Sequence, residues 1–287
     1  KENGWDILGQ RYDSTGATVG GEFLVNTETA GSQTGSSVTG LSDGGFVVTW
    51  NGSGTDIYGQ RFNSSGEKVN AEFQVNTLTT NIQKNASVSS LNDGGFVITW
   101  ESDRNELNAA YNTGYGVHAQ IFDANGNPVN NEFQVNSFEV GNQVQPSITA
   151  LSDGGFVIAW ASSKQDWSQW GSGIYTQRYN SSGEKVNAEF QVNTYIPNDQ
   201  SSPSITALVD GGFVITYQSQ VPNENTTFDH GIDIYGQRYN ISGEKVGDEF
   251  QVNTYTPQSQ RTPNTTALSD GGFVVTWESF SHEEGAT

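Results

Sequence analysis

The sequence predicts an all-β protein, a five-bladed β-propeller of four-stranded antiparallel blades, and three observations lead to this prediction. The chain repeats itself five times. Its apolar residues fall in short segments of strand length, several with strict alternation of apolar and polar residues. Turn signals rich in Gly, Asp, Asn and Ser separate these segments. Propellers are built from repeats of roughly 40 to 50 residues with four strands each.

Three short motifs define the repeat. The string DGGF begins at Asp43, Asp93, Asp153, Asp210 and Asp270. The string EF-x-VN begins at Glu22, Glu72, Glu132, Glu189 and Glu249, and a conspicuous Gln stands at Gln10, Gln60, Gln120, Gln177 and Gln237. Each Gln lies 13 positions before the Phe of EF, and that Phe lies 20 positions before the Asp of DGGF. The repeat is therefore rigid over most of its length.

All variation in length falls between the aromatic residue that closes GGFVxxW and the next Gln. This connection spans 10 positions from Trp50 to Gln60 but 20 from Trp100 to Gln120. Variation confined to one connection indicates a surface loop on one face of a repeat architecture. We therefore expect a single domain, residues 1–287, with fixed cores near 6–50, 56–100, 116–160, 173–217 and 233–277.

The repeat contains four expected strands, which we name A to D in chain order. Strand A, such as 147–151, holds small and β-branched residues that suit a crowded inner position. Strand B, such as 156–160, is apolar on both faces and should be buried on both sides. Strand C, such as 234–239, leads into a turn of the NSSG kind, and strand D, such as 246–253, alternates and should be half exposed. This order is typical of a blade read from axis to rim.

The ends of the chain predict how the ring closes. The chain starts in strand C, at residues 6–12, and stops after strand B, at residues 273–277. A propeller avoids open sheet edges by completing one blade from both ends. We therefore expect the N-terminal C and D strands to pair with the C-terminal A and B strands. A fragment cut from a longer array is the alternative.

Composition excludes several classes of function. The 287 residues carry 32 Asp and Glu against 12 Lys and Arg, a net charge of −20, which disfavours nucleic acid. No apolar run reaches the roughly 18 residues of a membrane span. There is no Cys, hence no disulfide framework or zinc–thiolate site. There is also no Met, so we expect a processed protein or an excised domain.

The segments DIYGQRY, EFQVN and SDGGFVVTW resemble tandem repeats of very large secreted bacterial proteins, which often also carry hemolysin-type (RTX) calcium-binding, cadherin-like or other adhesin modules. The resemblance covers essentially the whole chain. It implies residence outside the cell or on its surface, with adhesion or matrix roles, and brings no catalytic motif. The third repeat departs from the pattern, with His118 and Ile121 in place of the usual Tyr and Arg.

The variable B–C loops mark the expected binding face. They hold, or adjoin, aromatic residues outside the repeat pattern. Flat rings bind the C–H face of sugars, while amides bind hydroxyl groups. The alternative is that these rings pack the long loops. The candidates are Trp5, Tyr111, Tyr115, Trp167, Trp170, Phe228, His230 and His282.

A second candidate site occurs in every repeat. An Asn ends strand D and a Gln follows seven positions later, just before strand A. Five such pairs could form five equivalent ligand sites; the favoured alternative is that they satisfy backbone groups in the D–A crossover. The pairs are Asn26 and Gln33, Asn76 and Gln83, Asn136 and Gln143, Asn193 and Gln200, and Asn253 and Gln260.

Metal binding and catalysis have weaker support. Calcium could be held by Asp229 with Asp233 or by Glu283 with Glu284, but no turn fits a calcium loop. The five Asp residues of DGGF are expected to cap their own turns.

Five-bladed propellers do host glycosidases that use carboxylates near the axis. Here the inner strands are nearly uniform, and the three His are scattered, so the prediction is that the chain is not an enzyme.

The sequence thus favours an extracellular carbohydrate-binding or adhesion propeller that binds through its B–C loop face. The alternative is a structural or protein-interaction module of a large secreted surface protein, without a small-molecule ligand. A glycan-active enzyme is the third hypothesis. The expected partners are glycans or another surface or matrix protein.

Overall fold

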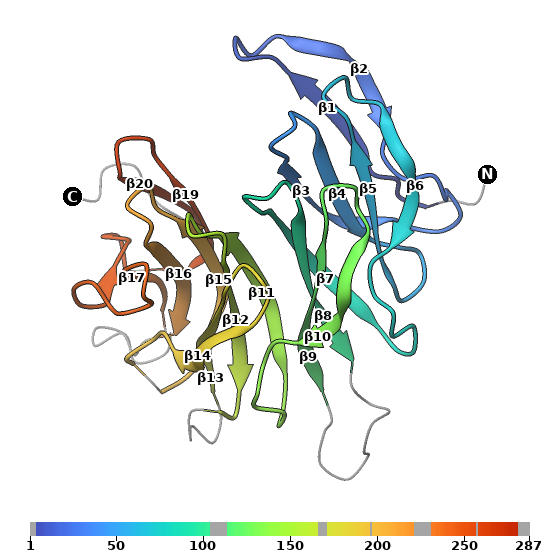
Figure 1. Ribbon diagram of the computed structural model, residues 1–287. Helices are drawn as coiled ribbons and strands as arrows, with labels where there is room; N and C mark the ends of the chain where they lie inside the picture. Colours follow the sequence, from blue (N-terminus) through green and yellow to red (C-terminus); the bar gives the residue numbers. More distant parts are fainter. Residues whose placement is uncertain are drawn as a thin grey trace.

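The computed structural model describes residues 4–103, 114–165, 171–195, 197–220, 231–256 and 258–280. These residues form twenty strands in six antiparallel sheets, four of them four-stranded and two of them two-stranded (Figure 1). In the described part of the chain, no helix is long and apolar enough to cross a bilayer. The predicted all-β architecture of repeated four-stranded blades is confirmed.

The strands follow the predicted order A, B, C, D in each blade. The first two-stranded sheet holds β1 (Leu8–Tyr12) and β2 (Thr18–Leu24). The four full blades are β3 (Thr34–Gly40), β4 (Phe46–Asn51), β5 (Ile57–Phe62) and β6 (Lys68–Gln74); β7 (Gln83–Ser90), β8 (Phe96–Asp103), β9 (Tyr115–Phe122) and β10 (Pro128–Gln134); β11 (Gln143–Ala150), β12 (Phe156–Ser163), β13 (Ser172–Tyr179) and β14 (Lys185–Gln191); and β15 (Gln200–Ala207), β16 (Phe213–Gln220), β17 (Ile232–Tyr239) and β18 (Phe250–Gln251). The last sheet holds β19 (Gln260–Ala267) and β20 (Phe273–Ser279).

Strand B is the most deeply buried strand of each full blade, as its apolar pattern predicts. In β12, seven consecutive residues from Phe156 to Ser162 are buried. Strand C pairs with it without interruption, from Phe156 opposite Tyr179 to Ser163 opposite Ser172. Strand D is largely exposed or half-buried, which places it at the rim. One D strand is shorter than the sequence indicates, because β18 spans only Phe250–Gln251, and Tyr239 and Lys245 form an isolated bridge before it.

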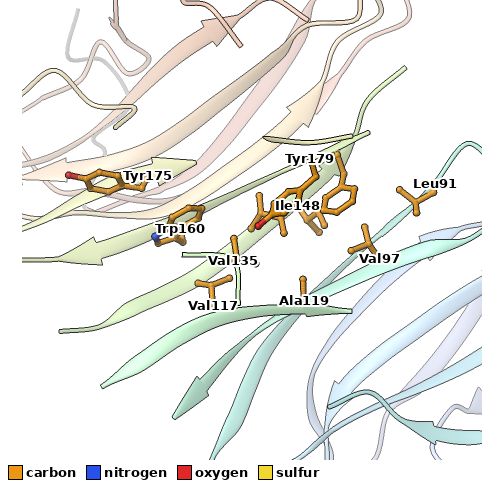
Figure 2. Packing of buried hydrophobic residues seen from close by; sticks show 11 residues of the cluster. Leu91, Val97, Val117, Ala119, Val135, Ile148, Trp160, Tyr175 and Tyr179 are labelled. Carbon is orange, nitrogen blue, oxygen red and sulfur yellow. The ribbon is translucent and has the colours of Figure 1, made fainter. Parts of the chain in front are cut away.

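The core lies between the blades. Leu91 and Val97 of one blade pack in one cluster with Ile148 and Trp160 of the next (Figure 2). Trp160 is completely buried there. Burying a large apolar side chain stabilises a fold by about 1.5 to 3 kcal/mol. Strand B of each full blade carries one such buried aromatic residue: Trp50, Trp100, Trp160 or Tyr217. The interfaces between blades, rather than a central core, therefore hold the array together.

The predicted closure of the ring is wrong for this structure. Within the described residues, β1 has only β2 as a sheet neighbour and β20 has only β19. We call β1–β2 the N-terminal half-blade and β19–β20 the C-terminal half-blade. The first packs on the β3–β6 blade and the second on the β15–β18 blade, and the two lie apart in Figure 1. The packing between successive blades sets an open arc that holds the two half-blades apart.

Candidate functional site

Each inner strand begins with a β-bulge that places one residue in the left-handed region of φ. The register of β11 on β12 shifts between Val144 and Ser147, and the bulge residue Gln145 has a φ of 57°. A positive φ is uncommon for residues other than glycine and clusters at functional sites. The five bulge residues and their φ values are Gly35 (64°), Asn85 (55°), Gln145 (57°), Ser202 (53°) and Thr262 (50°).

Four of these bulge residues line one pocket of about 420 Å³, which we call the axial mouth. Asn85, Gln145, Ser202 and Thr262 surround it, each from a different inner strand. The remaining lining consists of Pro146, Ser147, Pro203, Ser204, Pro263 and Asn264. Because the pocket lies where the inner strands begin, it opens on the face that carries the B–C loops and the D–A crossovers. Amides and hydroxyls dominate its polar surface.

The bulges are fixed by polar side chains of the preceding blade. Asn51 Oδ1 accepts a hydrogen bond from Asn85 N over 3.1 Å. Gln218 Oε1 accepts one from Thr262 N over 3.0 Å. These acceptors satisfy backbone groups that the bulge removes from the sheet ladder. The left-handed backbone at the axial mouth is therefore held in place by specific contacts.

One of these acceptors is a buried carboxylate. The side chain of Glu101 is only 2% exposed, and its Oε1 accepts hydrogen bonds from Gln145 N over 2.7 Å and from Asn85 Nδ2 over 2.8 Å. Lys84 Nζ lies 3.6 Å from Glu101 Oε2 and also 4.1 Å from the centre of the Tyr115 ring. Buried charges need such partners. The predicted loop aromatic Tyr115 is thus linked to the axial mouth through Lys84 and Glu101.

A second pocket, of about 520 Å³, adjoins the axial mouth on the same face. It lies between the β11–β14 and β15–β18 blades, and Lys164 and Asp199 contribute charged groups of opposite sign to its lining. Gln145 lines both pockets, and its Oε1 accepts a hydrogen bond from Ser202 N over 2.8 Å. The two pockets together form a polar hollow on the B–C loop face, and Gln145 stands between them.

The other predicted loop residues divide into two groups. Trp5 is 74% exposed and Asp233 is buried. The rest lie outside the described residues: Tyr111, Trp167, Trp170, Phe228, Asp229, His230, His282, Glu283 and Glu284. Lys164 and Gly171, which bracket the segment that holds Trp167 and Trp170, both line the second pocket.

The structure does not support the five Asn–Gln pairs as ligand sites. All ten side chains are buried, and their amides bind groups of the protein itself. Asn76 Oδ1 accepts from Ile57 N over 2.8 Å, while its Nδ2 donates to Asp56 Oδ1 over 2.7 Å and to Leu78 O over 2.8 Å. Gln83 accepts from Trp100 Nε1 over 3.2 Å. The interpretation as braces of the D–A crossover fits these contacts, because the amides of this pair bind backbone and side-chain groups of the fold.

The DGGF aspartate Asp153 and the calcium candidate Asp233, both within the described residues, are engaged in the fold as well. Asp153 Oδ1 accepts from Gly155 N over 2.9 Å, which confirms the predicted turn cap, and its other oxygen pairs with Arg178. Asp233 Oδ1 accepts from Asn253 Nδ2 over 2.7 Å, and burial raises its pKa. No cluster of three potential metal ligands occurs within the residues that the structure describes. Calcium binding stays a prediction for the part of the chain that lies outside them.

The bulge residues of the axial mouth are not among the residues that the sequence pattern predicted for a site. One signal was available: Gln145, Ser202 and Thr262 each precede a proline at the same position of the repeat. A proline cannot donate to a sheet ladder, so within strands it is confined to edges, strand starts and bulges. This would have marked an irregularity in strand A, although not a pocket.

No protein-family model matches the chain, and no curated protein matches it. Several solved structures are similar to the chain. A protein of unknown function from Dyadobacter fermentans shares 11% identity and a TM-score of 0.63, over 95% of this chain and 79% of that one. An α-L-arabinanase of Penicillium chrysogenum, complexed with arabinobiose, shares 13% identity and a TM-score of 0.57, over 85% and 74%.

A third similar structure is a family GH93 α-L-arabinofuranosidase of Fusarium graminearum with arabinobiose, at 11% identity and a TM-score of 0.55, over 85% of this chain and 74% of that one. Identities this low carry the architecture alone, since one fold hosts many functions. The chain therefore shares the β-propeller fold of arabinose-active glycoside hydrolases.

Proposed function

We propose that the chain is an extracellular carbohydrate-binding propeller that receives a glycan in the polar hollow of its B–C loop face. The observation that carries the proposal is the axial mouth, where amides and hydroxyls from four inner strands converge on one pocket. Sugar hydroxyl groups both donate and accept hydrogen bonds, so a lining of amides and hydroxyls suits them. Extracellular residence rests on the resemblance to repeats of secreted bacterial proteins.

Binding rather than hydrolysis is proposed because of the composition of the lining. Glycosidases need two carboxyl groups on either side of the scissile bond. The described lining of the axial mouth holds amides, hydroxyls and prolines, and the nearby Glu101 is committed to Lys84, Asn85 and Gln145. Arabinose-containing oligosaccharides are the first ligands to test, since the similar arabinanase and arabinofuranosidase structures contain arabinobiose.

The test is a glycan array that includes arabino-oligosaccharides, read with and without calcium and followed by calorimetry on the best ligand. We expect Asn264→Ala and Gln145→Gly to weaken binding about 3- to 10-fold each, the cost of one lost hydrogen bond. Glycine suits the left-handed backbone at position 145. Gln74→Ala, on the exposed rim strand β6, is the matched control and should bind as the wild type does.

Two outcomes would contradict the proposal. One is the absence of any glycan ligand on the array. The other is a ligand whose affinity is unchanged in both axial variants, which would place its site elsewhere. Release of reducing sugar from arabinan would instead support the glycan-active enzyme.

A further inference from the structure

Both half-blades, and strand β3 of the blade next to the N-terminal one, expose apolar side chains whose counterparts are buried in the other blades. In β3, Val38 is 65% exposed, whereas Ile148, at the same position of its repeat, is 7% exposed. Tyr12 is 63% exposed and Trp277 37%, although Tyr179 and Trp160 at the equivalent positions are buried. Exposed apolar patches of this kind mark interaction surfaces. The two ends of the arc therefore lack partners that every interior blade has.

The two half-blades are complementary parts of one blade. The N-terminal half-blade supplies strands C and D, and the C-terminal half-blade supplies strands A and B. Among the residues that the structure describes, β20 and β1 each have one sheet edge without a neighbouring strand. In the β15–β18 blade, Phe213 lies opposite Tyr239 and Tyr217 opposite Tyr235. The same register would place Phe273 opposite Tyr12 and Trp277 opposite Leu8.

The apolar surfaces also match. Within the chain, Leu91 and Val97 share a cluster with Ile148 of the following blade (Figure 2). Leu268 and Val274 hold the positions of Leu91 and Val97 at the C-terminal end, and each is about 40% exposed. At the N-terminal end, a pocket of about 270 Å³ is lined by Leu8, Phe23, Val38 and Phe46, among others. Leu268 and Val274 of another half-blade would fill it.

Charged residues at the two ends of the chain hold positions that form an ion pair within full blades. In three full blades an Arg of strand C pairs with the Asp of the A–B turn, as Arg178 does with Asp153. Arg11 and Asp270 hold these two positions at opposite ends of the chain. Arg11 instead donates to the carbonyl oxygens of Ser64 and Ser65. A joined blade would bring Arg11 and Asp270 together.

A second polar contact, between neighbouring blades, also recurs in the full blades and has counterparts at the two ends that are unpaired within the described part of the chain. In each full blade the Glu of EF accepts a hydrogen bond from the backbone of the preceding blade, as Glu132 Oε2 does from Thr77 N and Glu189 Oε2 from Ser137 N over 2.6 Å. Glu22 in the N-terminal half-blade is exposed, and Thr254 in the β15–β18 blade holds the position of Thr77. A joined blade would supply Thr254 N to Glu22.

We propose that the chain associates head to tail, with the C-terminal half-blade of one copy and the N-terminal half-blade of a second copy forming one four-stranded blade. Pairing within one chain would require the packed interfaces between blades to shift, because the two half-blades lie apart (Figure 1). A second copy needs no such change. The contact is heterologous, so further copies can add at the free ends.

Gly272 offers a variant that blocks this contact while sparing the free chain. A Cβ on Gly155, its counterpart in a full blade, would lie 2.3 Å from Tyr179 O of strand C. A Cβ on Gly272 meets only Asp270 Oδ1 at 3.2 Å and Leu268 Cδ1 at 3.8 Å, because strand C is missing there. In the joined blade the carbonyl oxygen of Tyr12 would occupy the place of Tyr179 O. Gly272→Ala should therefore prevent association but fold normally.

Sedimentation velocity over a range of concentrations tests the proposal. We expect the wild type to form oligomers that grow with concentration, and Gly272→Ala to stay monomeric with an unchanged circular dichroism spectrum. Arg11→Glu and Asp270→Arg should each weaken association about 5- to 10-fold, and the double variant should recover it. A wild type that is monomeric at every concentration would overturn the proposal.

Because the chain has no Cys, disulfide trapping identifies the partner. Leu8→Cys and Trp277→Cys proteins, mixed under mild oxidation, should give a disulfide-linked heterodimer in excess of either homodimer. The double-cysteine chain should give a ladder of linked copies. A crosslinked monomer in the double variant would show that the ring closes within one chain, and the proposal of a second copy would then be wrong.

Discussion

Asn136 donates a hydrogen bond from Nδ2 to Gln143 Oε1 over 3.2 Å, and Trp160 Nε1, close by, has no partner in the described part of the chain. The corresponding Gln33 accepts instead from Trp50 Nε1 over 3.2 Å. The difference traces to one position at the start of strand C. Where this position is Asp, as at Asp6, the Asn26 amide donates to that carboxylate. Gln33 Oε1 is then available to accept a hydrogen bond from the Trp50 indole. The equivalent residue Gly116 has no carboxylate, so the Asn136 amide donates to Gln143 Oε1 instead.

Replacing Gly116 with Asp should therefore restore the indole contact. The new carboxylate would accept from Asn136 Nδ2, and Gln143 Oε1 would become available to Trp160 Nε1. A hydrogen bond of this kind contributes about 0.5 to 1.5 kcal/mol, so the free energy of unfolding should rise by about 1 kcal/mol. Urea denaturation at pH 7 measures it. A variant less stable than the wild type would contradict this account.

The reverse substitution, Asp56→Gly, is the matched control. It should transfer the Asn76 amide to Gln83 and leave Trp100 Nε1 unpaired, as Trp160 Nε1 is now. The expected loss is about 1 to 3 kcal/mol, the cost of an unsatisfied buried donor. The same denaturation assay reads it, and equal stability of Asp56→Gly and wild type would argue against a shared network.

Removing one crossover brace should destabilise the fold without affecting ligand binding. Asn76→Ala loses the acceptor for Ile57 N and the donors to Asp56 and Leu78. We expect a loss of about 2 to 3 kcal/mol in unfolding free energy, because one buried donor and two half-buried acceptors are left unpaired. Glycan affinity measured well below the melting temperature should equal that of wild type. A selective loss of affinity in a stable variant would restore the ligand-site interpretation.

The blade architecture could be predicted because its signals are local and repeated. The alternation around Phe250 and the doubly apolar Phe156–Trp160 segment each report burial directly, and five repeats reinforce them. The ring closure could not be predicted in the same way. It depends on the angles between blades, which arise from packing across the interfaces and leave no periodic mark on the sequence.

The candidate site was predicted only in part. The B–C loop face was inferred from loop lengths and stays a prediction; of its aromatic residues, Tyr115 contacts Lys84, which pairs with Glu101. The Asn–Gln pairs were ambiguous because a polar residue at a fixed spacing serves a brace and a ligand site equally well. Gln145 was missed because its role depends on a bulge, and bulges depend on register between strands.

Stability at acid pH should depend on Glu132. Burial alone would raise the pKa of this carboxyl, but a hydrogen bond from Thr77 N and the His118 ring, whose Nδ1 lies 3.7 Å from Glu132 Oε1, lower it from 4.5 to about 2. A depressed pKa in the folded state means that the ionised group stabilises the fold above pH 4.5, and that this contribution is lost as the pH falls from there toward 2. Glu132→Gln should therefore flatten the pH dependence of the melting temperature in that window.

His118→Tyr provides the companion variant, since Tyr58, Tyr175 and Tyr235 stand at this position in other blades. It removes a group that lowers the pKa of Glu132, so it should also reduce the acid sensitivity. Glu67→Gln, in an exposed turn, serves as the control. Parallel melting curves for all four proteins between pH 4.5 and 2 would mean that Glu132 is not responsible.

The second glycine of DGG should respond differently in full blades and in the C-terminal half-blade. In Gly155→Ala, the new methyl group would meet Tyr179 O at 2.3 Å, and a strand backbone cannot move aside without breaking the sheet ladder. We expect a loss of about 1 to 3 kcal/mol in unfolding free energy, the usual cost of overpacking. In Gly272→Ala the nearest atom is Asp270 Oδ1 at 3.2 Å, on a side chain that can shift.

Gly272→Ala should therefore unfold within about 0.5 kcal/mol of wild type when both are compared at concentrations where the wild type is monomeric. At higher concentration the two proteins should diverge, because only the wild type gains stability from association. Thermal denaturation at two concentrations separates these effects. If Gly272→Ala were as destabilised as Gly155→Ala in dilute solution, strand C would already be in place beside β20 in the single chain.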